Sequence, residues 1–413
     1  MTDDLPAKML PEEACMPKSQ LYLHIGLSKS GTTYLQRTLW ASRDALGKSG
    51  VLYPGTNAHS QRMAAWDLLG RRLRGVDQPS LPGAWQRLVE SVTSWTGDKA
   101  LVSDEFLVHA RPRHLRRIQK DLSGQQLHVV VTVRDLGRTI LSMWQQELAS
   151  GNAWSLSEYV AAVRDPAAGP AKPAVRFWLR FDLERILATW QRIVPADRIH
   201  VVIVPPSGAP ADLLATRFTQ ATGLDLRALT LPEAPINASM GAVEAEMLRR
   251  LNTSLAGQVN EKDYNYLVER LIRPSLTPST GVRLPEEDIS WITARASEQA
   301  DMLRNGPYHV IGDPAELVPA DSSPGDHEPD PVDEVAVAAS SIAALHAVMV
   351  DYAKFRKKQA RKLAANASLA TKATSSVRAM TFGTGFAILN SADRSWAAAK
   401  VAQLYLWRVS RTR

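Results

Sequence analysis

A short segment near the start of the chain, residues 21–34, constrains the fold more than any other part of the sequence. Its first five residues, 21–25, are mainly apolar and predict a buried strand. Gly26 and Gly31 follow, and glycine lets the backbone turn sharply and approach a ligand closely. Residues 34–40 then have helical spacing. Because the free amides and the dipole at a helix N-terminus attract anions, the segment predicts a strand, an anion-binding turn and a helix.

The spacing of the two glycines matches the loop G-x-x-x-x-G-K-[ST] that holds nucleoside triphosphates. Thr33 occupies the Ser/Thr position of that motif, but Thr32 stands where the motif has lysine. Lys29 lies inside the loop, where it cannot bridge the β- and γ-phosphates from the helix. We therefore expect the loop to bind a phosphate or sulfate. The alternatives are a kinase or ATPase that uses Asp135 to hold magnesium, and a turn that binds no ligand.

A second apolar run, residues 127–133, leads into Arg134, and Ser142 follows eight residues later. An arginine at the carboxyl end of a strand can donate two parallel hydrogen bonds to a phosphate. A serine two turns into the next helix can add a hydroxyl donor. In the alternative interpretation, Arg134 pairs with a carboxylate and Ser142 is a buried helix residue.

Together these two motifs resemble those of the sulfotransferases that use 3′-phosphoadenosine 5′-phosphosulfate (PAPS). Residues 29–33 look like the 5′-phosphosulfate loop of that family, and the spacing from Arg134 to Ser142 is similar to its second signature, although Leu136 replaces the usual proline. The resemblance spans residues 20–310. It is greater for the bacterial and carbohydrate-type members, because the glycine-rich Arg-Lys-Gly segment of the cytosolic branch is missing.

The resemblance implies transfer of a sulfuryl group from PAPS to a hydroxyl or amine of a glycan, a glycolipid or a metabolite. Lys29 would stabilise charge on the leaving phosphate, and no metal is expected. The residues that the resemblance assigns to binding of PAPS are Ser28, Lys29, Ser30, Gly31, Thr32, Thr33, Arg134 and Ser142.

A third apolar run, residues 100–103, leads into Asp104 and Glu105. The family uses a glutamate or a histidine near this point as the base that accepts the proton of the acceptor, and the resemblance implies Glu105. Asp104 and His109 are the alternatives, and an ion pair with a nearby arginine such as Arg111 or Arg113 would give Glu105 a structural role instead. His24 is expected to be a core histidine.

Strands that alternate with helices along the chain predict a P-loop-like three-layer α/β fold, with a mostly parallel sheet between helices. The predicted strands are residues 21–25, 51–53, 100–103, 127–133 and 199–204. The predicted helices are residues 33–48, 60–74, 83–95, 113–122, 137–150, 175–193, 211–222, 240–252, 261–273 and 286–304. Ligands of such sheets bind beyond the carboxyl ends of the strands, so both motifs are expected at one site.

Two further segments are weaker candidates for the site. Asn237 or Ser239 can contact the nucleotide from a late loop, although capping of the following helix is the default role. The insert between the second and third predicted strands is a candidate acceptor cleft because it is rich in tryptophan and arginine. The tryptophans and arginines of this insert include Trp66, Arg71, Arg72, Arg74, Trp85, Arg87 and Trp95.

Charge divides the chain into four parts. We expect a disordered segment at residues 1–18, the sulfotransferase-like domain at 19–312, an acidic, proline-rich linker at 313–334 and a basic helical tail at 335–413. The net charge of +7 comes mainly from the tail, which has 13 Lys/Arg and two acidic residues after position 350. Such a tail can lie on an anionic membrane, dock on its own domain or be disordered. A membrane scaffold that acts through the tail is therefore an alternative function.

The chain has one cysteine, Cys15, and therefore cannot form an internal disulfide, which suits a reducing compartment. It shows neither an apolar signal segment nor an uninterrupted apolar run long enough to span a membrane. We expect a cytoplasmic protein, with the tail as a candidate peripheral contact to the inner face of the membrane. The expected partners are the donor nucleotide and the acceptor, without nucleic acid.

Overall fold

The computed structural model describes residues 19–72, 78–167, 171–232, 240–277, 279, 281–284, 286–319, 332–391, 400, 403–404 and 407. These residues form two compact units. The larger unit contains the chain up to Tyr266 and the residues from Leu276 to Ser341, and the smaller contains Leu267–Ser275 and the chain from Ile342 onward. Residues 1–18, which were predicted to be disordered, lie outside the described residues.

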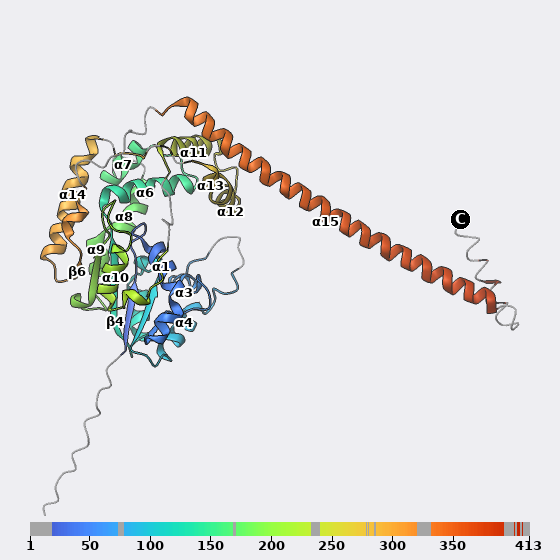
Figure 1. Cartoon of the computed structure of the whole chain (residues 1–413), viewed down its shortest axis with the longest axis horizontal. Helices are drawn as coiled ribbons and strands as arrows, with labels where there is room; N and C mark the ends of the chain where they lie inside the picture. Colours follow the sequence, from blue (N-terminus) through green and yellow to red (C-terminus); the bar gives the residue numbers. More distant parts are fainter. Residues whose placement is uncertain are drawn as a thin grey trace, which may run out of the picture. The chain divides into compact units, whose positions relative to one another are not determined.

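A six-stranded sheet with all neighbours parallel forms the centre of the larger unit. In spatial order the strands are β2 (Val51–Leu52), β3 (Lys99–Ser103), β1 (Gln20–His24), β4 (Gln126–Val133), β5 (Ile199–Ile203) and β6 (His309–Ile311). Helices flank this sheet (Figure 1), which is the predicted three-layer α/β arrangement. Fully parallel sheets are covered on both faces, and this explains why the central strands are apolar almost throughout.

The five predicted strands agree with the structure to within one residue at each end. The sequence analysis missed β6, which has only three residues and begins with the exposed His309. Its polar first residue leaves only Val310 and Ile311 to show an apolar run, one residue fewer than in the predicted strand 51–53.

The helices of the larger unit cover the sheet and build the surroundings of the site (Figure 1). Their bounds are α1 (Thr32–Ala41), α2 (Arg43–Lys48), α3 (Ser60–Leu69), α4 (Ala84–Thr93), α5 (Pro112–Asp121), α6 (Leu136–Ala149), α7 (Leu156–Arg164), α8 (Ala171–Phe181), α9 (Leu183–Trp190), α10 (Leu213–Thr222), α11 (Ala242–Leu255), α12 (Glu261–Asn265) and α14 (Glu286–Asn305). Leu35 and Leu39 of α1 pack with Phe218 of α10 in one buried cluster against the sheet.

Two predicted helices are each divided in the structure. The predicted helix at residues 33–48 breaks at Ser42, whose hydroxyl bonds to the Thr38 carbonyl at 2.7 Å and accepts from the Thr230 amide at 2.8 Å. The predicted helix at 175–193 breaks at Asp182, which caps α9 by accepting from the Arg185 amide. In both cases a short polar side chain offers the backbone an alternative hydrogen bond.

Other differences follow from local signals. Helix α7 was not predicted, although Ser155 and Glu158 form a reciprocal capping box at its start, with bonds of 3.2 and 2.8 Å. The predicted helix at 261–273 consists of α12, a π-helical stretch (Tyr266–Ile272) and the short α13 (Arg273–Ser275).

The first part of the predicted acidic linker belongs to the folded domain. Pro314–Leu317 forms a 3-10 turn that is capped by Asp313, and Leu317 is buried. Glu316 makes two hydrogen bonds to Arg217, at 2.6 and 2.7 Å. The predicted domain boundary at residue 312 is therefore too early, because the ion pair ties the segment to α10 and Leu317 is buried in the same unit. Residues 320–331 of the predicted linker lie outside the described residues.

The basic tail begins with one continuous helix, α15 (Glu334–Ser391) (Figure 1). Its first 30 residues, Glu334–Leu363, are long and apolar enough to cross a membrane, with a mean hydropathy of 1.6 over the best window. Only length and composition give this result, and helices of soluble proteins can meet the same criteria. The finding differs from the sequence-based expectation because serine and histidine interrupt the apolar run without adding charge.

Candidate active site at the carboxyl edge of the sheet

Three neighbouring strands carry the three segments that the sequence analysis singled out. The glycine loop follows β1, Asp104 and Glu105 follow β3, and Arg134 follows β4. Since β1 lies between β3 and β4 and all three are parallel, these segments meet at one edge of the sheet. Parallel sheets bind ligands at this edge.

The glycine loop is anchored to β4 and turns tightly. The Leu27 amide donates to the Thr132 carbonyl at 2.7 Å, and the Thr132 amide donates to the Gly26 carbonyl at 2.8 Å. Gly26 has φ +83°, and a Cβ atom on it would lie 2.9 Å from the Cβ of Glu105. The absence of a side chain at Gly26 therefore lets the candidate base lie directly against the loop.

Lys29 occupies the left-handed region with φ +63°, although it is not a glycine. This conformation costs about 1–2 kcal/mol for a residue with a side chain. Strain of this kind is concentrated at functional sites, where the surrounding structure holds it in place. Gly31 also has a left-handed backbone and caps α1 without any side-chain hydrogen bond, which leaves the helix N-terminus open to an anion.

The hydroxyl-bearing residues of the loop do not all face outward. The Ser30 hydroxyl is buried, donates to the Leu27 carbonyl and lies 2.6 Å from the Thr132 hydroxyl. Thr32 is also buried, whereas Thr33 is exposed and Ser28 is half-buried. The side chain of Ser30 thus holds the shape of the loop, and its direct contribution to an anion is limited to its amide.

Arg134 lies beside the loop, and its Nη1 donates to the Lys29 carbonyl at 3.4 Å. Burial lowers the pKa of Arg134 to about 10, and Arg138 acts in the same direction. No carboxylate lies within 4.0 Å of Arg134 in the part of the chain that the structure describes. A half-buried cation without a close carboxylate favours a bound anion, since burial of an unpaired charge is costly.

Asp135 caps α6 instead of facing the loop. Its carboxylate accepts from the Arg138 amide at 2.8 Å and forms an ion pair with the Arg138 side chain. Ser142 lies half-buried two turns further along α6. These contacts occupy the carboxylate that a magnesium-dependent kinase or ATPase would need.

A small cavity of about 10 Å³ lies between the loop and the start of α6, and its lining includes Ser28, Ser30, Arg134 and Thr139. This volume holds about one water molecule and is too small for a nucleoside. Asn237 and Ser239, the predicted late-loop contacts, lie outside the described residues.

Glu105 is held by two donors and keeps a side-chain exposure of 19%. Gln36 of α1 donates to one oxygen at 3.0 Å, and Arg62 of α3 donates to the other at 2.6 Å. The ion pair is the predicted structural alternative for Glu105, with Arg62 as the partner. The Cβ of Glu105, and not its carboxylate, lies against the loop at Gly26.

The two alternative bases have different surroundings. Asp104 is buried, accepts from the Phe106 amide and pairs with Arg62 at 3.0 Å. Burial raises the pKa of Asp104 to about 6, against the opposing effect of Arg62. His109 is half-buried beside several arginines, and burial followed by the charge of Arg71 lowers its pKa to about 4. Of the three candidates, Glu105 is the one in contact with the loop.

His24 is a core residue, as the sequence indicated. Its two ring nitrogens lie 2.7 Å from the Ser103 hydroxyl and 3.2 Å from the Thr132 hydroxyl. Complete burial lowers its pKa to about 3 and keeps the ring neutral. It ties together the strands that carry the site.

A cleft of about 1290 Å³ lies next to the carboxylates, and both Arg62 and Phe106 line it. Of the insert residues that were predicted to line an acceptor cleft, Arg71 does so. Trp85 instead lies in the core, where its ring nitrogen donates to Asp121 at 2.7 Å. The ring nitrogen of Trp95 donates to the Gly50 carbonyl. Arg74 lies outside the described residues.

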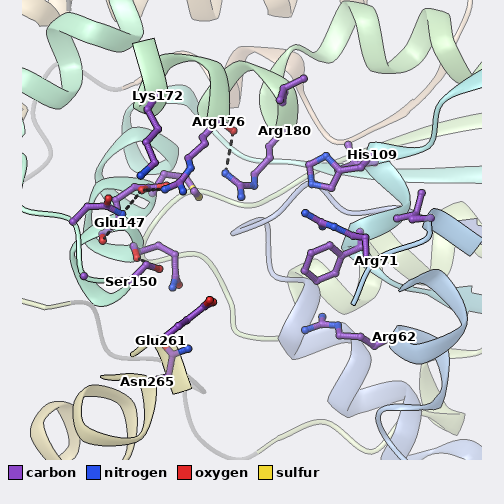
Figure 2. A pocket seen from close by; sticks show the side chains of 18 of the residues that line it. Arg62, Arg71, His109, Glu147, Ser150, Lys172, Arg176, Arg180, Glu261 and Asn265 are labelled. Atoms are coloured by element: carbon purple, nitrogen blue, oxygen red, sulfur yellow. Dashed lines mark hydrogen bonds and ion pairs between the residues drawn. The ribbon is translucent and has the colours of Figure 1, made fainter. Parts of the chain in front are cut away.

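The opposite wall of the cleft comes from a helix that the sequence analysis did not connect with the site. Lys172, Arg176 and Arg180 project from α8 into the cleft, across from Arg62 and Arg71 (Figure 2). Arg176 and Arg180 lie four residues apart on the predicted helix 175–193, and Lys172 lies four residues before Arg176, so this spacing was the signal that could have revealed a basic face. Among the described residues, no group of three or more His, Cys, Asp or Glu side chains could hold a metal ion.

No protein-family model and no curated protein sequence matches this chain. Among solved structures, a crystal structure of a sulfotransferase from Alicyclobacillus acidocaldarius is similar to it, with 11% sequence identity and a TM-score of 0.34. The match covers 60% of this chain and 95% of that chain. A similarity at this level carries no weight for function, so the topology and the site geometry must support any assignment.

Proposed function

We propose that the protein is a PAPS-dependent sulfotransferase that acts on a hydroxyl or amine of a glycan, a glycolipid or a metabolite. One geometric observation carries the proposal. A strained glycine loop, an arginine without a close carboxylate partner and a partly buried glutamate follow three neighbouring strands and lie together at one edge of the sheet. The approach of Gly26 to Glu105 and the bond from Arg134 to Lys29 hold them together.

The loop and Arg134 fit the phosphate end of such a donor. When bound, PAPS supplies an activated sulfuryl group attached to a 5′-phosphate. The N-terminus of α1 and the Arg134 guanidinium would hold the phosphate oxygens, and Lys29 would place its ammonium near the developing negative charge. Ser142 remains a candidate for a further hydroxyl donor.

The acceptor side is supported by Glu105 and the adjoining cleft. Glu105 would accept the proton of the acceptor group, and Arg62 and Gln36 orient its carboxylate. Because Arg62 also lines the cleft, a group that enters the cleft can change how tightly Arg62 holds the glutamate. In this proposal the cleft delivers the acceptor to the edge of the sheet.

Calorimetric titration with adenosine 3′,5′-bisphosphate (PAP), the desulfated product, tests the donor site. The wild-type protein should bind PAP without magnesium, and Arg134→Ala should weaken this binding about 10- to 100-fold, because it removes charge-assisted hydrogen bonds. Arg192→Ala is a matched control, since Arg192 is exposed and lies outside both cavities. Magnesium-dependent binding of ATP without binding of PAP would overturn the proposal and favour a kinase or ATPase.

A further inference from the structure

The large cleft carries far more positive than negative charge. Eight lysine or arginine side chains line it, against the two carboxylates of Glu147 and Glu261. Figure 2 shows the basic side chains on facing walls, with Arg62 and Arg71 on one side and the residues of α8 on the other. The two walls come from segments about 100 residues apart in the sequence, so the concentration of charge is created by the fold.

Helix α8 presents its charges as a stripe. Lys172, Arg176 and Arg180 repeat every four residues and therefore share one side of the helix. Phe177 and Phe181 are buried on another side. The packing of these phenylalanines fixes the rotation of α8, and the stripe must then face the cleft.

Carboxylates pair with three of the eight cations that line the cleft. Arg62 contacts Asp104 and Glu105, and Arg185 contacts Asp182. Arg176 is paired, because it donates to the buried Glu147 at 2.8 Å. Arg180 donates to the Arg176 carbonyl at 3.0 Å, and the Arg71 guanidinium lies 4.7 Å from the centre of the Phe106 ring. In the described part of the chain, no carboxylate lies within 4.0 Å of Arg71, Lys172 or Arg180.

The cations without a close carboxylate differ in exposure, because Arg71 and Lys172 are exposed and Arg180 is half-buried. Burial lowers the pKa of Arg180, the charge of Glu147 opposes this shift, and the smaller effect of Arg176 acts in the same direction as burial. His109 stays neutral between the arginines because its pKa is lowered to about 4. Like charges on the two walls repel one another, and an anionic ligand between the walls would be attracted by both.

We infer that the acceptor is a polyanion, which carries at least two carboxylate, sulfate or phosphate groups besides the group that receives the sulfuryl group. This inference rests on the proposed function, since it identifies the cleft as the acceptor site. Arg71 and the stripe on α8 would bind the anionic groups from opposite sides. A cleft of about 1290 Å³ exceeds the usual range of about 300–1,000 Å³ for small-molecule sites and suits an oligomer.

Calorimetry on the full-length protein with PAP present tests the inference. The probes are a sulfated isomaltotetraose, neutral isomaltotetraose and inositol hexakisphosphate. The first two differ only in charge, and the first and third compare sulfate groups with phosphate groups. The sulfated probe should bind at least 10-fold more tightly than the neutral one. Arg71→Gln and Arg180→Gln should each weaken this binding about 10-fold, and Arg192→Gln should leave it unchanged. Arg176 is avoided because its loss would leave Glu147 buried without its partner.

The outcomes separate this inference from the proposed function. If inositol hexakisphosphate binds more tightly than the sulfated sugar, the acceptor is still a polyanion, but one whose anionic groups are phosphates. Equal binding of charged and neutral tetrasaccharides would overturn the inference while PAP binding still supports the donor site. If Arg71→Gln and Arg180→Gln bind the sulfated probe as tightly as the wild type, the anion binds outside the cleft, for example on the basic tail. This result would also overturn the inference. Failure of the wild-type protein to bind PAP would overturn both.

Discussion

At the scale of single residues, Arg62 links the two parts of the candidate site. Its guanidinium contacts Asp104 at 3.0 Å and Glu105 at 2.6 Å, and the same side chain lines the cleft. It also lies 5.0 Å from the centre of the Phe106 ring. One arginine therefore connects the acid pair after β3 with the surface that would receive the acceptor, although it lies about 40 residues before them in the sequence.

The choice of Glu105 as base leads to a prediction at this scale. Glu105→Gln should lower turnover by about 10²- to 10⁴-fold, because a neutral amide cannot accept the proton. PAP affinity should stay within a few-fold of wild type, since the loop and Arg134 are unchanged. Turnover is measured with radiolabelled PAPS and an anionic acceptor that binds in the cleft.

His109→Gln serves as the comparison for this variant. It should keep most of the turnover if Glu105 is the base, because His109 then only lines the cleft. A large loss in His109→Gln with normal turnover in Glu105→Gln would assign the base to the histidine instead. Loss of PAP affinity in Glu105→Gln would mean that the carboxylate supports the loop.

At the scale of elements, a row of histidines crosses three adjacent strands away from the site. His128 of β4 lies 3.0 Å from His200 of β5, which lies 2.9 Å from His309 of β6. Tyr22 of β1 stacks on His128 with ring centres 4.6 Å apart. Burial lowers the pKa values of His128 and His200 to about 4, so both rings are neutral at pH 7.

This row predicts that stability falls in mild acid. Between about pH 6.5 and pH 4 the unfolded chain binds protons that the folded chain excludes from His128 and His200, so the free energy of unfolding decreases as the pH falls. Asp104 acts in the opposite direction below about pH 6, because its folded pKa is raised. His128, His200, His24 and His109 all have lowered pKa values, so their combined effect on the free energy of unfolding should exceed that of Asp104.

Thermal unfolding followed from pH 7.5 to pH 4.5 checks this expectation. The melting temperature should fall with pH, and His200→Gln should show a weaker dependence. His59→Gln, at an exposed position, should keep the dependence of the wild type. A melting temperature that rises on acidification would show that the carboxylates dominate.

At the scale of the whole molecule, the tail presents a long apolar and basic surface. Its helix carries exposed apolar side chains, among them Ile342, Leu345, Met349, Tyr352 and Phe355. The basic cluster Arg356, Lys357 and Lys358 follows them directly. We propose that this combination attaches a cytoplasmic protein to the anionic inner face of a membrane, where a glycolipid acceptor would be in reach.

Vesicle co-sedimentation tests this attachment. The full-length protein should sediment with vesicles that contain phosphatidylserine. Replacement of Arg356, Lys357 and Lys358 by glutamate should abolish this co-sedimentation. Charge reversal at Arg192 is the control. Equal binding to neutral phosphatidylcholine vesicles would contradict an electrostatic attachment and favour insertion of the apolar part of α15.

The sequence by itself predicted the elements that depend on local physics. The five predicted strands are recognisable because burial on both faces requires continuous apolar runs. The loop after β1 is recognisable because its two glycines have the spacing of an anion-binding turn that precedes a helix. The sequence also placed Glu105 and Arg134 at strand ends, and in a parallel sheet strand ends lie on one edge.

Only the tertiary structure decided which residues meet across that edge. Arg62 contacts Glu105 because α3 packs beside the 3-10 turn that begins at Glu105, and no spacing along the chain encodes this contact. The basic cleft exists because α8 turns its charged stripe toward Arg71, and Ser30 turns inward because Thr132 of the neighbouring strand offers a partner. Such contacts depend on how whole elements pack, whereas strands, turns and helices are governed by the residues within them.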